Sequence, residues 1–258
     1  MPNFNDSDEL QKQYGTAKNL NTRASLHAMF STNKLGWSSW VFQQYGLRPG
    51  LSVLELGCGS ADMWAGRAEA LRGVKLLLSD FSEGMLEAAR ESTHDLPGVS
   101  YEQIDAQDIP HFDGSFDMVI ANHMLYHVPD IDKALGEIAR VLRPGGMFYA
   151  TTLGVGNMKE LHDMLHRFHP ESERLRGSFT AAFRLENGAP QLCRHFAHVE
   201  LRRYPDSLHV TQAQPLIDYA LSMAGMEDAG EFARHIEGII ARDGAIDITK
   251  DAGMFIAR

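Results

Sequence analysis

The stretch Val53-Leu-Glu-Leu-Gly-Cys-Gly-Ser-Ala-Asp62 joins a short apolar run to a glycine-rich turn. The run predicts a buried strand, and the two glycines let a ligand approach the backbone of the turn closely. A dinucleotide fingerprint would place a third glycine at position 62, with phosphates at the start of the following helix. Position 62 is Asp, which repels a pyrophosphate, and Glu55 adds a second carboxylate. The turn therefore favours a ligand that carries an ammonium or sulfonium group.

Outward from this turn, apolar runs alternate with helical patterns. The strand-like runs cover residues 51–56, 74–80, 116–121 and 147–152. Helical patterns follow at residues 61–71 and after Ser82, which is the expected N-cap. A third helical pattern runs from Ile131 to Leu142, and Arg143-Pro-Gly-Gly146 ends it. This alternation predicts an α/β fold whose mostly parallel sheet has helices on both faces.

The two ends of the sequence depart from this alternation. Residues 1–45 contain an amphipathic, aromatic-rich stretch, which predicts an N-terminal helical cap or lid. The remainder, 46–258, is predicted to form one domain with a core at 46–152 and a helical insertion with substrate-pocket elements at 153–245. Within and after that insertion, helices are expected at 158–168, 214–223 and 231–241, and strands at 198–204 and 253–257.

Composition excludes several functional classes. The formal net charge of -10 disfavours a nucleic-acid partner, whose phosphates it would repel. Two cysteines are too few for a disulfide framework. No export signal is visible at the start, and no apolar run approaches the roughly 18 residues of a membrane span. These features predict a soluble cytoplasmic protein without a membrane partner.

Three histidines, His162, His166 and His169, have a spacing that places imidazoles near one helical face. However, Pro170 ends that helix, and no carboxylate or cysteine at ligand spacing completes the set. The sequence therefore predicts no metal site.

Five segments, in chain order, carry a resemblance to a known family. They are residues 53–62, Asp80 with Phe81, Asp105-Ala-Gln107, residues 116–121 and Leu142-Arg-Pro-Gly-Gly146. Together they resemble the successive motifs of class I S-adenosylmethionine-dependent methyltransferases, over roughly residues 46–152. The resemblance implies a Rossmann-like, doubly wound sheet of seven strands. It also implies S-adenosyl-L-methionine as the cofactor and S-adenosyl-L-homocysteine as its product.

The same resemblance assigns parts of the cofactor to particular residues. Gly57 and Gly59 would contact the methionine part, and Asp80 the ribose. Phe81 and Met85 would cover the adenine faces, although apolar residues at helical spacing are also typical of a core. The whole implied cofactor set is Glu55, Gly57, Cys58, Gly59, Asp80, Phe81, Met85, Asp105, Ala106, Gln107 and Asn122.

Methyl transfer from a sulfonium requires an aligned acceptor and the exclusion of water. A hydroxyl or protonated amine acceptor also needs a base. The candidates for that catalytic role are His123 and Tyr126, which follow the strand at 116–121, whereas His127 is assigned a structural role. Lid residues predicted to face the substrate are Tyr14, Arg23, Asn33 and Trp37.

The acceptor class follows from charge and from one motif. Amino-methyltransferases of DNA and some RNA carry Asn/Asp-Pro-Pro-aromatic after the fourth strand, to hold a flipped base. Here that place reads Asn122-His-Met-Leu125. Methylation of an oxygen or nitrogen atom of a small molecule is therefore the favoured hypothesis. A methyltransferase of protein or RNA, a non-methylating cofactor-binding protein and an NAD-dependent dehydrogenase are the alternatives, and the oligomeric state is left open.

Overall fold

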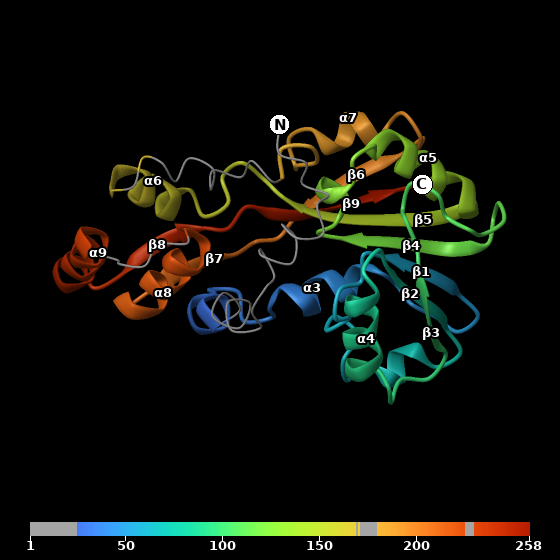
Figure 1. Cartoon of the computed structure of the whole chain (residues 1–258), viewed down its shortest axis with the longest axis horizontal. Coiled ribbons are helices and arrows are strands. Elements are labelled where there is room, and N and C mark those ends of the chain that lie inside the picture. The colour runs from blue at the N-terminus through green and yellow to red at the C-terminus, as the bar shows by residue number, and fades with distance from the viewer. Residues whose placement is uncertain (1–24, 169, 171–179, 225–229) are drawn as a thin grey trace. The chain divides into compact units, whose positions relative to one another are not determined.

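The central element is a seven-stranded sheet with the strand order β3-β2-β1-β4-β5-β9-β6 (Figure 1). The computed structural model describes residues 25–168, 170, 180–224 and 230–258. The strands of the sheet are β1 (Ser52–Leu56), β2 (Lys75–Asp80), β3 (Val99–Gln103), β4 (Phe116–Asn122), β5 (Leu142–Leu153), β6 (Val199–Arg203) and β9 (Ala252–Ala257). β9 lies antiparallel between β5 and β6, and the strands from β3 to β5 are mutually parallel. The predicted fold class, a mostly parallel seven-stranded α/β sheet, is confirmed.

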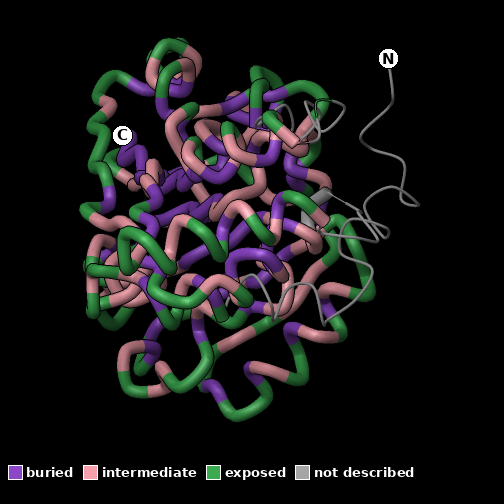
Figure 2. Tube along the Cα trace, turned by 90° about the vertical axis from the view of Figure 1, so that its left-hand side faces the viewer, coloured by how far each residue is buried: buried purple, intermediate pink, exposed green. Residues whose placement is uncertain are grey.

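Strand residues alternate between two apolar clusters because successive side chains point to opposite faces. Leu54 and Leu56 of β1 join one cluster, and Val53 joins the other. Most residues of β1, β4 and β9 are buried, whereas β3 and β6 contain no buried residue. Figure 2 shows the buried residues in purple in the interior of the trace. Parallel strands that are covered on both faces have nearly continuous apolar sequences, and this pattern allowed them to be predicted.

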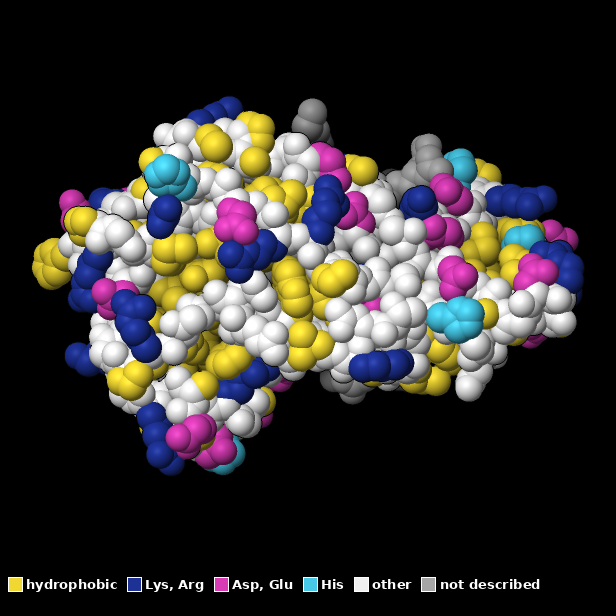
Figure 3. Space-filling model, turned by 180° about the vertical axis from the view of Figure 1, so that it is seen from behind, with side chains coloured by type: hydrophobic (Ala, Val, Ile, Leu, Met, Phe, Trp, Pro, Cys, Tyr) yellow, Lys and Arg dark blue, Asp and Glu magenta, His cyan; other side chains and the backbone are white. Residues whose placement is uncertain are grey.

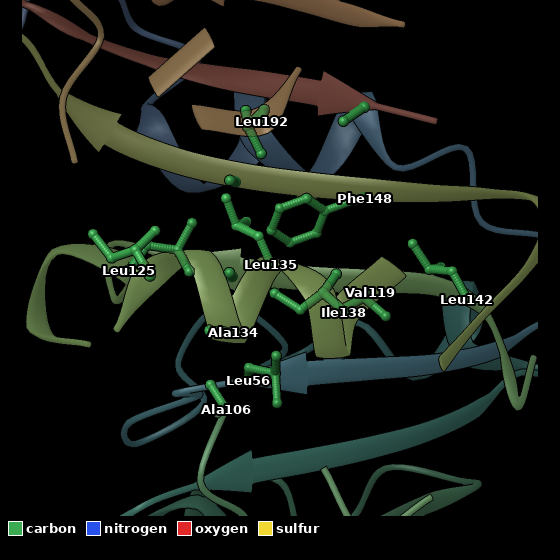
Figure 4. Packing of buried hydrophobic residues seen from close by; sticks show 14 of the residues in the cluster. Leu56, Ala106, Val119, Leu125, Ala134, Leu135, Ile138, Leu142, Phe148 and Leu192 are labelled. Atoms are coloured by element: carbon green, nitrogen blue, oxygen red, sulfur yellow. The ribbon is translucent and has the colours of Figure 1, made fainter. Parts of the chain in front are cut away.

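Helices cover both faces of the sheet. They are α3 (Trp37–Gln44), α4 (Glu83–Ser92), α5 (Ile131–Val141), α7 (Gly188–Leu192) and the 3-10 helices η1 (Ala68–Leu71) and η2 (Leu125–His127). Residues of α5 and α7 pack in one cluster, and Val41 of α3 and Ala89 of α4 pack in the other. Figure 4 shows Leu135 and Ile138 of α5 directed at Phe148 of β5.

Two local predictions after β1 and α5 were wrong. Residues 61–71 form turns and η1 rather than one helix, because Ala61 and Gly66 have left-handed φ values of 58° and 71°. Leu142 already pairs with Phe116, so β5 begins before the Arg-Pro-Gly-Gly segment instead of after it. A register irregularity between Phe116 and Met118 accommodates the four residues.

The chain divides into two compact units. Unit 2 contains the sheet and comprises Trp37–Leu153, Ala182–Arg203 and Ala252–Arg258. The described residues of unit 1 lie within Met1–Gly36, Gly154–Ala181 and Tyr204–Asp251. The boundaries expected from the sequence, 1–45 and 153–245, differ from this division, because α3 and the segment with α7 and β6 contribute to the sheet's own packing.

Unit 1 has a separate apolar core, formed by residues such as Leu161, Leu208 and Phe232. Its elements are α6 (Lys159–Phe168), α8 (Ala213–Ala224), α9 (Gly230–Asp243) and the antiparallel pair β7 (Ser207–Val210) and β8 (Ile246–Thr249). Residues 25–30 are helical as well. In the part of the chain described, no helix is both long and apolar enough to cross a membrane.

Candidate cofactor-binding and active site

The two glycines of the turn after β1 serve different purposes. Both have left-handed φ values, 63° for Gly57 and 55° for Gly59. A Cβ atom on Gly57 would lie 2.7 Å from the Cβ atom of Met124, so protein packing itself requires glycine there. A Cβ atom on Gly59 would meet nothing within 4 Å. Gly59 therefore leaves backbone open to a ligand.

Asp80 ends β2 beside this turn. One carboxylate oxygen accepts a hydrogen bond from the Gly59 N–H at 2.9 Å, and the other accepts one from the Ser82 N–H at 2.9 Å. Ser82 is the N-cap of α4, as predicted, because its side chain accepts from the Met85 N–H. A carboxylate has about four acceptor positions, so Asp80 retains capacity for ligand hydroxyls.

Phe81 is a large apolar side chain that folding leaves in contact with solvent. Its side chain is 68% exposed, so the interpretation of Phe81 as a core residue is excluded. The Gln103 side-chain amide donates to the Phe81 carbonyl at 2.7 Å and fixes the backbone there. Met85, one turn further on, is half-buried. An exposed ring beside Asp80 is suited to stacking on a planar heterocycle.

The loop after β3 holds a second carboxylate. The Gln107 N–H donates to Asp105 at 2.9 Å, and its side-chain amide donates to both Asp105 oxygens at 3.0 and 3.2 Å. The Gln107 side-chain carbonyl accepts from the Asp130 N–H at 3.1 Å. Ala106 is buried between them. Gln107 thereby orients Asp105 and ties its loop to the start of α5.

Glu55 is buried beneath the turn, with 2% of its surface exposed. Its oxygens accept from the indole N–H of Trp64 and, at 2.8 Å, from the Asn122 amide. Burial raises the pKa of Glu55 to about 7. The two hydrogen bonds lower this pKa, but the effect of burial is larger. Burial, reinforced by the charges of Glu55 and Asp80, also raises the pKa of the Cys58 thiol. Cys58 is thus held as a neutral thiol inside the turn.

Asn122 is engaged within the protein. Its amide donates to Glu55 and, at 2.8 Å, to the Tyr45 hydroxyl, and its carbonyl oxygen accepts from the Thr151 hydroxyl at 3.2 Å. Both amide hydrogens are therefore used. This geometry supports Asn122 as an orienting group for Glu55. Sequence reasoning missed Tyr45 and Trp64, because their role comes from burial against the sheet and not from any local spacing.

His123 follows β4 directly and has a left-handed φ of 51°. Its N–H donates to the carbonyl and to the hydroxyl of Thr151, both at 3.1 Å. Its ring lies 5.2 Å from that of Trp37. The structure therefore brings one predicted base and one predicted lid residue together.

Tyr126 is half-buried on η2, with its ring 4.6 Å from that of His127. Burial lowers the pKa of His127, and the charge of Asp80 opposes that change. A neutral, partly buried imidazole agrees with the structural role expected for His127.

Asn33, the lid residue that falls in unit 1, is bonded within that unit. Its amide donates to the Pro205 carbonyl at 3.0 Å, and its carbonyl oxygen accepts from the Leu35 N–H at 3.1 Å. Tyr14 and Arg23 lie outside the described residues, as does His169. Within those residues, no three histidine, cysteine or acidic side chains form a group that could hold a metal ion.

The residues at the carboxyl ends of β1, β2 and β4 fit S-adenosylmethionine. The open backbone at Gly59 gives room for the chain of the ligand, and Asp80 has free acceptor positions for ribose hydroxyls. Phe81 offers an exposed ring for adenine. Ligands of open α/β sheets bind at this edge, where the strand order reverses.

Comparison with known proteins agrees with this geometry. The sequence profile of the methyltransferase domain family matches residues 54–150. Demethylmenaquinone methyltransferase of Staphylococcus aureus strain MRSA252 is 38% identical over 112 residues, which cover 43% of this chain and 46% of that protein. The chain thus matches about half the length of this relative.

Solved structures share the fold at low sequence identity. Phosphoethanolamine N-methyltransferase 2 of Haemonchus contortus, in complex with S-adenosyl-L-methionine, has a TM-score of 0.59 and 18% identity, over 97% of this chain and 59% of that one. A protein of Bacillus halodurans assigned as a methyltransferase has a TM-score of 0.58 and 18% identity, over 86% and 97% of the two chains. Residues 54–150 thus form a methyltransferase domain, and the motif order and the sheet agree with the class I S-adenosylmethionine-dependent type.

Proposed function

We propose that the protein transfers the methyl group of S-adenosylmethionine to an oxygen or nitrogen atom of a small-molecule acceptor. The observation that carries this proposal is the pair formed by Gly59 and Asp80. An open glycine donates to a carboxylate that still has acceptor capacity, beside the exposed ring of Phe81. That combination suits an adenosine carrying an amino-acid chain.

Two observations support a small acceptor. The names of two similar proteins, demethylmenaquinone methyltransferase and phosphoethanolamine N-methyltransferase, specify small molecules. Acidic and basic side chains are interspersed on the face seen in Figure 3, and the formal net charge is -10. Neither feature favours an RNA acceptor.

The residues of this chain have defined tasks in the proposed reaction. Bound S-adenosylmethionine supplies an activated methyl group, and the C–S bond electrons stay with the sulfur, which becomes a neutral thioether. Asp80 binds the ribose. His123, directly after β4, accepts the proton of an acceptor hydroxyl or ammonium, and the lone pair of the acceptor oxygen or nitrogen then attacks the methyl carbon. Tyr126 is the alternative base from the same segment.

Calorimetric titration with S-adenosylmethionine, S-adenosylhomocysteine and NAD tests the cofactor part. We expect binding of the first two and none of NAD. Transfer of a radiolabelled methyl group to a panel of phenols, catechols, amines and quinols tests the reaction. Binding without transfer to any small molecule, but with transfer to RNA or protein in a cell extract, would contradict the proposed acceptor class. Binding of NAD alone would contradict the cofactor.

A further inference from the structure

His123 has an unusual backbone conformation at the carboxyl edge of the sheet. Residues with a side chain rarely adopt a φ of 51°, and when they do the surrounding structure must hold them there. Here the neighbouring strand β5 holds it, because Thr151 accepts the His123 N–H with both its carbonyl and its hydroxyl oxygen. Thr151 is 1% exposed, so this anchor is shielded from water. The backbone is thereby fixed, and the imidazole has an aromatic support as well.

That support comes from α3. The Trp37 ring lies 5.2 Å from the imidazole at an interplanar angle of 44°. Trp37 in turn stacks on Trp40, one helical turn later, at 5.6 Å and 28°. The indole that contacts the imidazole is therefore itself packed against a second indole.

The same helix is anchored to the residue before His123. Trp37, Val41 and Tyr45 follow one another at a spacing of four residues, which places them on one face of α3 and its continuation. Val41 and Tyr45 are buried in the sheet's second apolar cluster, and the Tyr45 hydroxyl bonds to the Asn122 amide. Asn122 is thus contacted by Tyr45, which directly follows α3, and His123 by Trp37 of α3.

We propose that Trp37 is a positioning residue, which holds the imidazole of His123 in the orientation that deprotonates the acceptor. This inference rests on the proposed function. The residues of α3 lie before the stretch that the methyltransferase domain profile matches, 54–150, so the family assignment does not include them. The positioning group therefore lies outside the matched methyltransferase domain.

The test compares Trp37→Ala and Trp37→Phe with Gln43→Ala, a substitution at an exposed position of the same helix. The first readout needs no turnover. The imidazole resonance of His123, identified by its loss in His123→Gln, is followed by NMR over a pH titration. We expect Trp37→Ala to move this resonance and its titration midpoint, because the indole ring current and contact are lost. Trp37→Phe and Gln43→Ala should retain most of the wild-type behaviour.

The second readout is the rate of methyl transfer. We expect Trp37→Ala to lower kcat by about tenfold or more and to alter the acid-side limb of the pH profile, where the general base becomes protonated. Its dissociation constant for S-adenosylmethionine should stay within about twofold, and Trp37→Phe should restore kcat to within about threefold.

Two results would overturn the positioning role. One is a His123 resonance that titrates identically in Trp37→Ala and in the wild type. The other is an unchanged kcat and pH profile in Trp37→Ala while the wild-type protein is active. Failure of the proposed function is recognised separately, because the wild-type protein then transfers no methyl group before any variant is compared.

Discussion

Glu55 is a carboxyl group that folding removes from water, and among the described residues no cationic side chain forms an ion pair with it. Its pKa rises from 4.5 to about 7. Between these values the native state binds the proton more strongly than the unfolded chain does. The free energy of unfolding therefore falls as the pH rises across this window, by up to about 3 kcal/mol from this group.

Glu55→Gln removes that dependence because the amide does not ionise. We expect the variant to gain stability relative to the wild type between about pH 5 and about pH 8. Urea unfolding of both proteins at the two pH values measures the difference. An equal stability difference at both values would contradict the burial of an ionisable Glu55.

The glycines of the turn predict two separable effects. Gly57→Ala combines a left-handed φ with a Cβ atom 2.7 Å from Met124, so it should lower stability by more than the about 1 kcal/mol of backbone strain alone. Gly59→Ala meets no protein atom within 4 Å and should cost only that strain. Its main effect should be weaker binding of S-adenosylhomocysteine. Thermal unfolding and calorimetry together distinguish the two variants, and equal loss of stability would contradict the assignment.

Asp80→Ala should weaken cofactor binding by more than about 1 kcal/mol, since charge-assisted hydrogen bonds to the ribose are lost. Calorimetric titration measures this change. Asp95→Ala, which removes an exposed carboxylate, is the control and should bind with wild-type affinity. Unchanged affinity in Asp80→Ala would remove Asp80 from the cofactor site.

At the scale of elements, Arg140 of α5 clamps the loop between β3 and β4. Its guanidinium donates to the carbonyls of Ile109 and His111, at 2.8 and 2.7 Å, and to the Glu137 carboxylate. Lysine lacks the planar set of donors, so Arg140→Lys should lose about 2 kcal/mol of stability. Arg90→Lys, at an exposed ion pair, should lose less than about 0.5 kcal/mol. Denaturant unfolding tests both, and equal effects would contradict the clamp.

The sequence pattern predicted the strands whose side chains are buried on both faces of the sheet. β1, β2 and β4 read as apolar runs, whereas β3, with the sequence Val-Ser-Tyr-Glu-Gln, was not predicted from its pattern because it is a partly exposed edge strand. β7 and β8 have four residues each, too few for a clear period.

The residues of the candidate site also fall into those that the sequence predicted and those that it did not. Gly57, Gly59 and Asp80 belong to local motifs with fixed spacing, so the sequence named them. The contacts of Trp64 with Glu55 and of Tyr45 with Asn122 join residues 9 and 77 positions apart, and only the tertiary structure reveals them. The roles of His123, Tyr126 and the cofactor contacts stay predictions, which the experiments above test.

At the scale of the whole molecule, the two units have separate apolar cores. Unit 1 also contains a buried ion pair. In unit 1 the side chain of Asp206 is fully buried and pairs with Lys250 at 2.9 Å. It also accepts from the Ser31 hydroxyl at 2.6 Å and from the Asn33 N–H at 2.9 Å. These contacts join residues 31–33 to the segment before β7 and to the end of β8.

Asp206→Ala should leave Lys250 buried without its partner and destabilise unit 1 by about 3–5 kcal/mol. Hydrogen exchange should then lose protection in α8 and α9, while β1 and β4 keep theirs. Uniform loss of protection in both units would contradict the separation of their cores. The control is Asp247→Ala, because this carboxylate makes only an exposed pair with His209.

The place of β9 has a consequence for synthesis of the protein. This strand pairs with both β5 and β6. In chain order it comes after β5, after β6 and after the described parts of unit 1. A nascent chain on the ribosome therefore presents the open edges of β5 and β6 until residues 252–257 have emerged. During that interval the edges are open to pairing with other chains, so the yield of native protein should depend on chaperones that cover strand edges.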